Sequence, residues 1–310
     1  MRCVIAVCTY RRPLLLNSLL EQLLDQAQRN LDLRLQLIVV DNDEALSARP
    51  VVEEFARRSS PLITEYVSAQ PQGLVVARNA ALEYAKSLGS PIIFIDDDET
   101  PRDEWLSSIW AMHSAFPRDI VAGPVIPKFE SDLPNWCEDG SFWMRPTFAD
   151  ATPLTKPTGD GNILYPIDLV NRWRYSLRFN TSGGQDTHLL RRWMEAGGVV
   201  RWSARAEVDE IVPAGRLTFA YALDRTYFSS LAYVWVDREL GATRWWTLLR
   251  SGRRYLIGGL DYAAATLRQD WGRQRRAKLH FASARGTRHG LKLSSFDRYA
   301  DYQIDAAEHA

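Results

Sequence analysis

The chain has 310 residues, of which 46% are hydrophobic and 25% charged, a composition typical of one large globular domain or of a domain with an appendage. Its formal net charge is zero, and it has no apolar run long enough for a membrane-spanning helix, so none is expected. The three cysteines lack the spacing of a metal site, and no signal peptide precedes the first predicted strand. We therefore expect a protein of the reducing cytoplasm.

Strand and helix patterns alternate along the first 126 residues. Apolar, β-branched runs predict strands, and apolar residues spaced by three or four predict helices. The predicted strands are 3–8, 35–40, 62–67, 91–95 and 120–126, and the helices between them are 13–28, 48–59, 74–88 and 103–116. Repeated β-α-β units predict an α/β fold with a Rossmann-like, mainly parallel and twisted sheet flanked by helices.

The remainder of the chain is less regular. Residues 127–157 are rich in Pro, Trp and Phe and lack periodicity, which is typical of a functional or mobile segment. Further on, the patterns predict helices at 167–177 and 186–196, short strands at 199–202 and 206–212, and a helical C-terminal extension from 217 to about 276.

Positive charge is concentrated near the C-terminus. Between Arg238 and Lys292 the sequence holds thirteen Lys and Arg residues against three acids, which favours an anionic surface such as a membrane, a nucleic acid or a polyanionic glycan; of these, a nucleic acid is not expected as a partner. Residues 243–257 mix Trp, Leu and Arg. This mixture fits a helix lying in a membrane interface, and it fits equally an amphipathic helix that covers the core with a solvated basic face.

Four consecutive acids, Asp96, Asp97, Asp98 and Glu99, follow the predicted buried strand 91–95. Like charges at such close range repel, and a divalent cation compensates them, because carboxylate oxygens are preferred ligands of Mg²⁺ and Mn²⁺. The end of a strand in an α/β sheet is also where such folds place ligands. The alternative is an acidic turn that caps the next helix.

Three further polar motifs follow predicted strands or open helices. They are Thr9-Tyr10-Arg11-Arg12 after the first strand, Asp41-Asn42-Asp43 after the second, and Gly73 to Asn79 at the start of a helix. A helix N-terminus favours anions, and Arg78 is suited to a carboxylate or a phosphate. Taken singly, each motif is explained as well by an Asx-turn or a surface ion pair.

Together and in this order, the four motifs resemble the nucleotide-sugar-binding half of family 2 glycosyltransferases with the GT-A fold. The resemblance continues in Gly161-Asn162, which is similar to the acceptor-side turn of that family, and in Gly183 to Leu189, which is similar to its catalytic Gly-Glu-Asp-x-x-Leu motif. The motifs cover roughly residues 3–216 and are most similar to exopolysaccharide glycosyltransferases of the succinoglycan type.

The resemblance implies a donor site and a cofactor. A Mn²⁺ or Mg²⁺ ion would be held by Asp98 and Asp96, although the run of acids leaves open whether Asp97 or Glu99 takes the place of either. The implied nucleotide-sugar contacts are Thr9, Tyr10, Arg11, Asp41, Asp43, Gly73, Arg78, Asn79, Asp96 and Asp97.

The resemblance also implies a base and an acceptor site. Asp186 would be the general base; without the upstream motifs it would be read as a helix cap. Gln185 stands where the family usually has Glu. This departure affects the acidic residue that normally precedes the base more than it affects the base, Asp186, itself. The implied acceptor contacts are Gly161, Asn162, Trp136, Gln185 and His188.

The expected function is inverting transfer of a sugar from a UDP-sugar to a hydroxyl of a glycan or polyprenyl-linked acceptor, in the cytoplasm or at the inner face of the plasma membrane. The expected domains are 1–216, with a donor half 1–126 and an acceptor half 127–216, and the extension 217–310. A sugar nucleotidyltransferase is the alternative enzyme, but the Gly-rich, Lys-containing phosphate loop that it needs is not evident. A non-catalytic sugar-binding protein is the third reading, supported by Gln185 alone.

Overall fold

The computed structural model describes residues 2–58 and 62–293, which fall into two compact units. The first unit comprises 1–126, 145–180 and 185–211, and the second comprises 127–144, 181–184 and 212–310. The irregular segment after residue 126 is thus divided, and its first part belongs with the C-terminal helices rather than with the sheet. The compact units therefore follow a different division from the expected boundary at residue 216.

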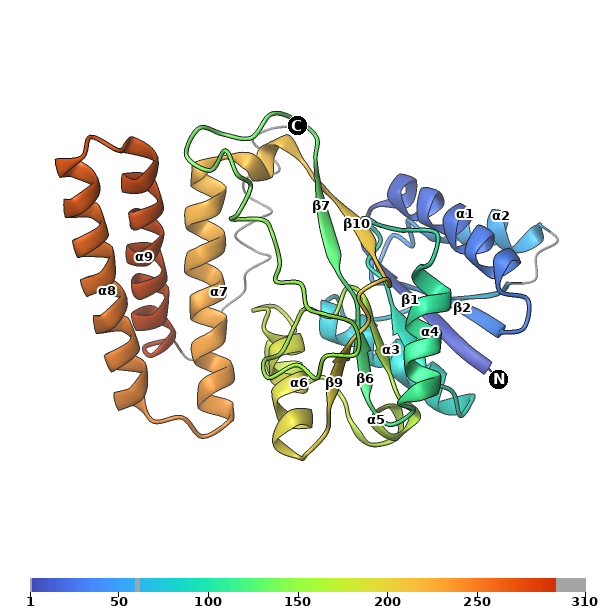
Figure 1. Ribbon diagram of the computed structural model, residues 1–310. Coiled ribbons are helices and arrows are strands. Elements are labelled where there is room, and N and C mark those ends of the chain that lie inside the picture. The colour runs from blue at the N-terminus through green and yellow to red at the C-terminus, as the bar shows by residue number, and fades with distance from the viewer. Residues whose placement is uncertain (1, 59–61, 294–310) are drawn as a thin grey trace. The chain divides into compact units, whose positions relative to one another are not determined.

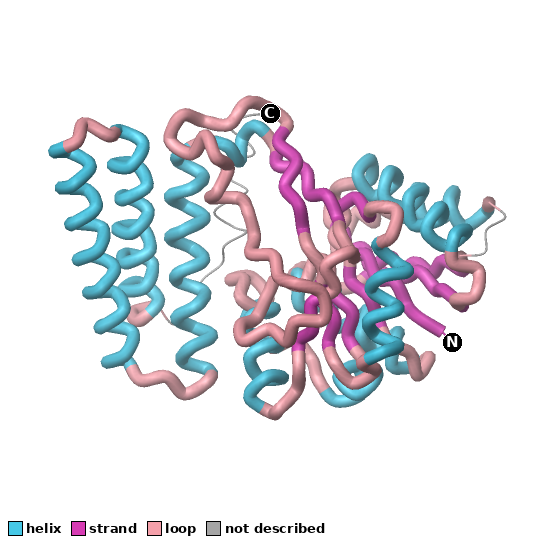
Figure 2. The backbone as a smooth tube through the Cα atoms, in the orientation of Figure 1, coloured by secondary structure: helices cyan, strands magenta, loops and turns pink. Residues whose placement is uncertain are grey.

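A seven-stranded sheet forms the centre of the first unit (Figures 1 and 2). Its strand order is β3-β2-β1-β4-β8-β6-β9. The strands β1, β2, β3 and β4 are parallel to one another, β8 is antiparallel to both of its neighbours, and β6 is parallel to β9. The predicted mainly parallel α/β sheet is confirmed. Its strands are β1 (Arg2–Thr9), β2 (Arg34–Asp41), β3 (Ile63–Ser68), β4 (Ile92–Phe94), β6 (Ile120–Ala122), β8 (Ile163–Tyr165) and β9 (Val200–Trp202).

Both faces of this sheet are buried, as a parallel sheet requires. Cys3, Ile5 and Val7 on one face of β1 pack into a core shared with three helices, α1, α2 and α4. The alternate residues Val4 and Ala6 are also fully buried, and α3 contacts β1 and β2. The helices of this unit are α1 (Pro13–Arg29), α2 (Arg49–Arg57), α3 (Leu74–Ser87), α4 (Trp105–Ala115), α5 (Ile167–Arg172) and α6 (Gln185–Glu195), with a short 3₁₀ helix, η1 (Leu177–Phe179).

A second, three-stranded sheet has the order β5-β10-β7 and contains β5 (Glu99–Pro101), β10 (Val208–Val212) and β7 (Val125–Phe129). The single strand expected at 120–126 is therefore two strands, β6 and β7, interrupted at Gly123 and Pro124. Proline has no amide hydrogen to donate to a sheet, which favours an interruption at this position. The strands β5 and β8 have three residues each and show no periodicity that would predict them.

Three helices dominate the second unit: α7 (Phe219–Glu239), α8 (Arg244–Leu267) and α9 (Trp271–Gly290), preceded by the 3₁₀ helix η2 (Ala214–Leu217). Helix α9 lies between the other two and contacts both (Figure 1). The continuous helical extension expected here is interrupted twice, because Thr243 and Asp270 each cap a new helix by accepting a hydrogen bond from its first turn. None of the helices in the described part of the chain combines the length and the apolar character needed to cross a bilayer.

Candidate active site

The polar residues predicted to form the donor site meet at one edge of the main sheet. Strand β1 lies between β2 and β4, and all three are parallel, so the residues that follow them leave the sheet at the same edge. Thr9 ends β1, Asp41 ends β2, and the four acids begin two residues after β4. This edge, at the carboxyl ends of parallel strands, is where open α/β sheets bind ligands.

The four acids alternate between the interior and the solvent. The Asp97 side chain is 6% exposed, and its Oδ2 accepts a hydrogen bond from the Thr9 hydroxyl at 2.7 Å. Glu99 is buried as the first residue of β5, and its Oε2 accepts the Asp96 amide hydrogen at 3.1 Å. The side chains of Asp96 and Asp98 remain 43% and 18% exposed. Asp96 and Asp98 are therefore the more exposed acids. Asp97 and Glu99, which were considered as substitute ligands, accept internal hydrogen bonds instead.

A buried arginine fixes the position of Asp96. The Arg78 side chain is 3% exposed, and its Nη2 lies 2.8 Å from Asp96 Oδ1 and 3.3 Å from Asp160 Oδ1. Its Nη1 donates to the Asp160 carbonyl oxygen at 3.0 Å. The other carboxylate oxygen of Asp160 accepts the Tyr175 hydroxyl at 2.8 Å, and that hydroxyl is 3.0 Å from the one of Tyr165. Arg78 thus connects two carboxylates within a hydrogen-bonded network.

The sequence analysis did not single out Asp160 or Tyr175. The position of Asp160 between Gly159 and Gly161 could have indicated its role. A glycine-rich turn with one acid is suited to a site where backbone and ligand approach closely. No local pattern marks Tyr175, which reaches the network only through the fold.

Gly161 packs directly against the acids. A Cβ atom at this position would lie 2.6 Å from Glu99 Oε1 and 2.7 Å from Asp96 Oδ2, well inside van der Waals contact. The turn predicted to face the acceptor therefore also forms one wall of the carboxylate cluster. A glycine is required here because the backbone at this position lies so close to the carboxylates that no Cβ fits.

Two further cations lie near the acids. Arg12 Nη1 lies 2.9 Å from Asp97 Oδ1 and 3.1 Å from Asp98 Oδ2. The positive charge of Arg145 lowers the pKa of Asp96, but burial is the larger influence and raises that pKa to about 6. Burial likewise raises the pKa of Asp97 to about 6, against the lowering effect of Arg12. At both carboxyls the effect of burial on the pKa therefore exceeds the opposing effect of the neighbouring guanidinium groups.

Asp186 lies in the first turn of α6, as expected, and its Oδ1 accepts the Thr187 amide hydrogen at 2.6 Å. Burial raises the pKa of this carboxyl, whereas the Thr187 hydrogen bond and the charge of Arg78 lower it. The charge of Asp186 in turn raises the pKa of Asp160. Asp186 is thus within electrostatic reach of the network that holds Asp96.

Three residues predicted to contact ligands have their polar atoms engaged within the protein. The Asp41 carboxylate is fully buried and accepts hydrogen bonds from the amides of Asp43 and Ala48 and from the Tyr66 hydroxyl. The Asn79 Nδ2 donates to the Tyr175 carbonyl oxygen, and the Asn79 Oδ1 accepts the backbone N–H of Tyr175. Both side chains thus make internal hydrogen bonds, and their contact with a nucleotide stays a prediction.

Asn162 is also buried, and it links three segments of the chain. Its Oδ1 accepts from the Trp105 indole at 2.9 Å, and its Nδ2 donates to the carbonyl oxygens of Pro124 and Ala206 at 3.0 and 2.7 Å. Its contact with an acceptor stays a prediction.

The other donor-side predictions lie at the same edge with different exposure. Tyr10 is partly exposed, and the Arg11 guanidinium lies 5.0 Å from its ring centroid. Arg11 also pairs at 3.2 Å with the buried Asp43, whose pKa is lowered by this and other hydrogen bonds despite its burial. Gly73 precedes α3 with a positive φ of 145°, and the Asn180 side chain occupies the space beside it.

The remaining acceptor-side predictions differ in position. Trp136 is buried in the second unit, where it packs against Phe142, Trp143 and Phe219. In this position the ring is part of the aromatic core of that unit, and its contact with an acceptor stays a prediction. Gln185 and His188 are buried in α6, and the His188 ring packs on Phe179 at a centroid distance of 4.8 Å.

Comparison with known proteins identifies the family. The model of the family described as Glycosyl transferase family 2 matches residues 4–164, slightly more than half of the chain. The chain belongs to glycosyl transferase family 2. The match spans the strands, the acid run and the Gly161 turn of the site described above.

One relative and two solved structures extend this assignment. The glycosyltransferase is 29% identical over 309 residues to succinoglycan biosynthesis protein ExoM of Rhizobium meliloti strain 1021, covering 98% of this chain and 97% of the relative. Its fold is similar to that of S. aureus TarS 1-349, with a TM-score of 0.50, 14% identity and 91% of each chain covered. It is also similar to GalNAc-T7 crystallised with UDP, GalNAc and Mn²⁺, with a TM-score of 0.51, 12% identity, and 76% of this chain and 51% of that chain covered. The predicted family and GT-A fold are confirmed.

Proposed function

We propose that this family 2 glycosyltransferase transfers a sugar from a UDP-sugar to a hydroxyl of a glycan or lipid-linked glycan, with inversion and with the assistance of a divalent cation. The observation that carries the proposal is the presence of a partly exposed Asp96-x-Asp98 after β4 together with Asp186, which is within electrostatic reach of the network that holds Asp96. The similarity to a succinoglycan biosynthesis protein and to GalNAc-T7 with UDP, GalNAc and Mn²⁺ supports the proposed substrate class.

The residues at this edge fit a Mn²⁺ or Mg²⁺ ion. Within residues 2–58 and 62–293, no three His, Cys, Asp or Glu side chains are arranged to hold a metal by themselves. Mg²⁺ usually binds to one or two carboxylates together with substrate phosphates and water, rather than in an all-protein cage. Asp96 and Asp98 supply two such carboxylates, and the excess negative charge around them favours a cation. An ion held there would offset the charge that develops on the diphosphate leaving group.

The chain's own residues position the donor. Arg78 holds the Asp96 carboxylate from behind, so that its other oxygen is directed toward Gly161 and the solvent-exposed side. Arg12 and Arg145 are proposed to contact diphosphate oxygens, because guanidinium groups bind phosphates through paired hydrogen bonds. Tyr10 and Arg11 at the end of β1 are proposed to contact the nucleoside.

Asp186 is proposed to accept the proton of the acceptor hydroxyl. As that proton moves to Asp186, a bond forms from the hydroxyl oxygen to the anomeric carbon, and the bond from that carbon to the diphosphate oxygen breaks with its electron pair. Attack from the face opposite the leaving group inverts the configuration. A raised pKa suits this role, because a base accepts protons best when its pKa approaches the working pH.

The acceptor is proposed to approach along Gly161, which packs against Asp96, and along Gln185 and His188, which flank Asp186 in α6. Gln185 keeps the size of the glutamate that the family usually has, without its charge. A polyprenyl-linked acceptor would place the enzyme at the inner surface of the plasma membrane.

The test has two arms with a matched control. Thermal unfolding with UDP, ATP or NAD, each with and without Mn²⁺, should show stabilisation by UDP that depends on the ion, about 2.7 kcal/mol when UDP is at 100 times its dissociation constant. Asp186→Asn should leave that stabilisation intact and lower kcat by roughly 10²–10⁴-fold. Asp98→Ala should abolish the dependence on Mn²⁺.

The control is Asp103→Asn, which removes the charge of a side chain that is 87% exposed. It should behave as the wild type in both arms. Full turnover by Asp186→Asn would reject Asp186 as the base, and stabilisation by UDP that is indifferent to Mn²⁺ in the wild type would reject the role of the cation.

A further inference from the structure

One face of helix α8 is apolar, and the described residues of the second unit leave it exposed. Trp245, Leu249, Leu256, Leu260 and Leu267 are between 51% and 88% exposed. They are spaced by four and seven residues, so they lie on one side of the helix over about six turns. We call these five residues the α8 stripe.

The opposite side of α8 is packed against α9. Thr247, Ser251, Gly258 and Ala265 are buried, and the Ser251 hydroxyl donates to the Ala284 carbonyl oxygen at 3.1 Å. A Cβ on Gly258 would lie 2.9 Å from the His280 Cβ, so the two helices are in close contact. The α8 stripe is therefore not the core-facing side of this helix.

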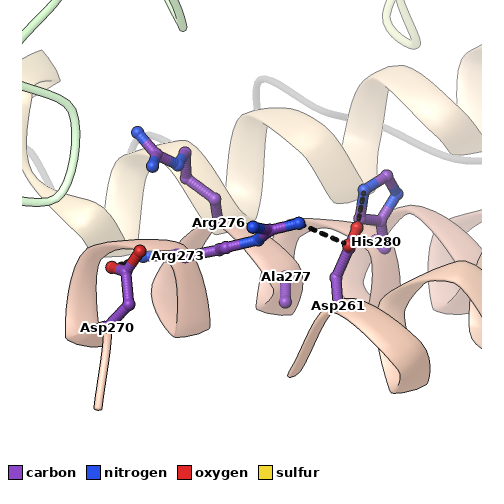
Figure 3. A pocket seen from close by; sticks show the side chains of 6 residues that line it. All are labelled: Asp261, Asp270, Arg273, Arg276, Ala277 and His280. Atoms are coloured by element: carbon purple, nitrogen blue, oxygen red, sulfur yellow. Dashed lines mark hydrogen bonds and ion pairs between the residues drawn. The ribbon is translucent and has the colours of Figure 1, made fainter. Parts of the chain in front are cut away.

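The charge around the α8 stripe is positive. Helix α8 has four arginines and one acid, Asp261. That acid faces α9, where it lies 3.4 Å from Arg273 and 3.8 Å from His280 (Figure 3). These three residues line a polar cavity of about 290 Å³ together with Asp270 and Arg276. The carboxylate of α8 is thus turned toward α9, and Arg253 adjoins the stripe.

We infer that the α8 stripe docks on an anionic lipid surface, in an orientation with the helix parallel to the membrane plane. A helix with a Trp- and Leu-rich face flanked by Arg is suited to this position, since its apolar side chains enter the headgroup boundary and its guanidinium groups remain at the lipid phosphates. The thirteen Lys and Arg residues against three acids from Arg238 to Lys292 provide the complementary charge.

Charge also decides against a second copy of the chain as the occupant. In a two-fold symmetric pair, each α8 stripe would face the other, and the Arg253 side chains beside the two stripes would be brought together. Asp261 is engaged with α9 and is not placed to pair with them. Anionic phosphates would relieve this repulsion, whereas a self-complementary interface would increase it.

The experiment sediments the full-length protein with vesicles of phosphatidylcholine alone or with added phosphatidylglycerol. We expect binding to the anionic vesicles, which weakens as salt is raised. The double substitution Leu256→Gln and Leu260→Gln should weaken this binding at least roughly tenfold, because both side chains leave the apolar boundary. Arg253→Gln should weaken it by about fivefold, at about 1 kcal/mol per basic residue at the surface.

The matched control is the double substitution Leu14→Gln and Leu31→Gln, which changes two leucines of the first unit that are 85% and 74% exposed. It should bind vesicles as the wild type does. Unfolding temperature and turnover of UDP-sugar with a water-soluble acceptor are measured for every variant, so that a catalytic failure is separated from a docking failure.

Three outcomes would overturn the inference. The first is that the wild type is absent from the anionic vesicle pellet. The second is that the control variant loses binding as much as the α8 variant does. The third is that vesicle binding is lacking and the wild type forms a concentration-dependent dimer, which the Leu256→Gln and Leu260→Gln variant abolishes. The last result would assign the α8 stripe to a second copy of the chain.

Discussion

Replacing Gly161 with alanine should disable the site while leaving the fold intact. Ordinary van der Waals contact begins at about 3.4 Å, and the new Cβ would lie 2.6 Å from Glu99 Oε1 and 2.7 Å from Asp96 Oδ2, so the two oxygens must move by about 0.8 and 0.7 Å. Asp96 is held by Arg78, and Glu99 is buried. Neither oxygen can yield without disturbing the network.

A displacement of this size is large for catalysis and moderate for stability. Misplacement of a catalytic group by about 1 Å costs roughly 10²-fold in rate, and inserting a methyl group into a packed site typically costs about 1–3 kcal/mol. We therefore expect Gly161→Ala to lower kcat/KM by roughly 10²-fold and to weaken the stabilisation by UDP that depends on Mn²⁺. The substitution needs no unusual backbone angle, because Gly161 is not among the residues with positive φ.

Gly159 provides the control two residues away. A Cβ at Gly159 would lie 3.9 Å from Arg145 Nη1, which is an ordinary contact, so Gly159→Ala should retain the activity and the donor binding of the wild type. Both variants are compared by thermal unfolding, by UDP release and by the shift in unfolding temperature with UDP and Mn²⁺. Equal behaviour of the two variants would refute the argument that the acids are positioned by contact with Gly161.

Three further predictions follow from the same contacts. Asp160→Asn should lower the free energy of unfolding by about 1–3 kcal/mol in a urea titration at pH 8, where Asp160 is ionised and paired with Arg78; an unchanged midpoint would contradict this. The kcat/KM should fall by up to about tenfold per pH unit in acid, with a midpoint above the ordinary carboxyl value, because burial raises the pKa of Asp186 and protonation removes the base. Asn180→Ala should cost about 0.5–2 kcal/mol in the same titration, because Asn180 Oδ1 accepts the Val76 amide hydrogen in the first turn of α3.

The sequence was a good guide to the parts of the fold that are long and periodic. The leucine stripe of α1 is the buried face of that helix, and the apolar run of β2 is a buried strand. Each pattern is therefore visible without the rest of the chain. The strands β5 and β8 were not predicted, because three residues are too few to show a period. Strand β8 is nevertheless central, and its antiparallel pairing with β4 and β6 completes the sheet.

Within the site, residue type and position along a strand predicted which residues would gather, but not which way each would face. The alternation in the acid run depends on β5, since Glu99 turns inward as the first residue of that strand. Asn79 and Asn162 are as polar as any ligand-binding residue, yet each is used by backbone groups that lie far away in sequence. The partners of such side chains are set by tertiary packing, which a local motif does not contain.

The arrangement of charge at the edge of the sheet also explains why donor and cation should bind together. Arg78 is buried between Asp96 and Asp160, so its charge is committed to these two carboxylates, while Arg12 is shared between Asp97 and Asp98. A diphosphate arriving alone would meet the carboxylates of Asp96 and Asp98 at close range and be repelled. A cation arriving alone would find two protein ligands and would need further oxygens, which the diphosphate supplies. Each ligand therefore provides what the other lacks, and linkage requires that each raise the affinity of the other by the same factor.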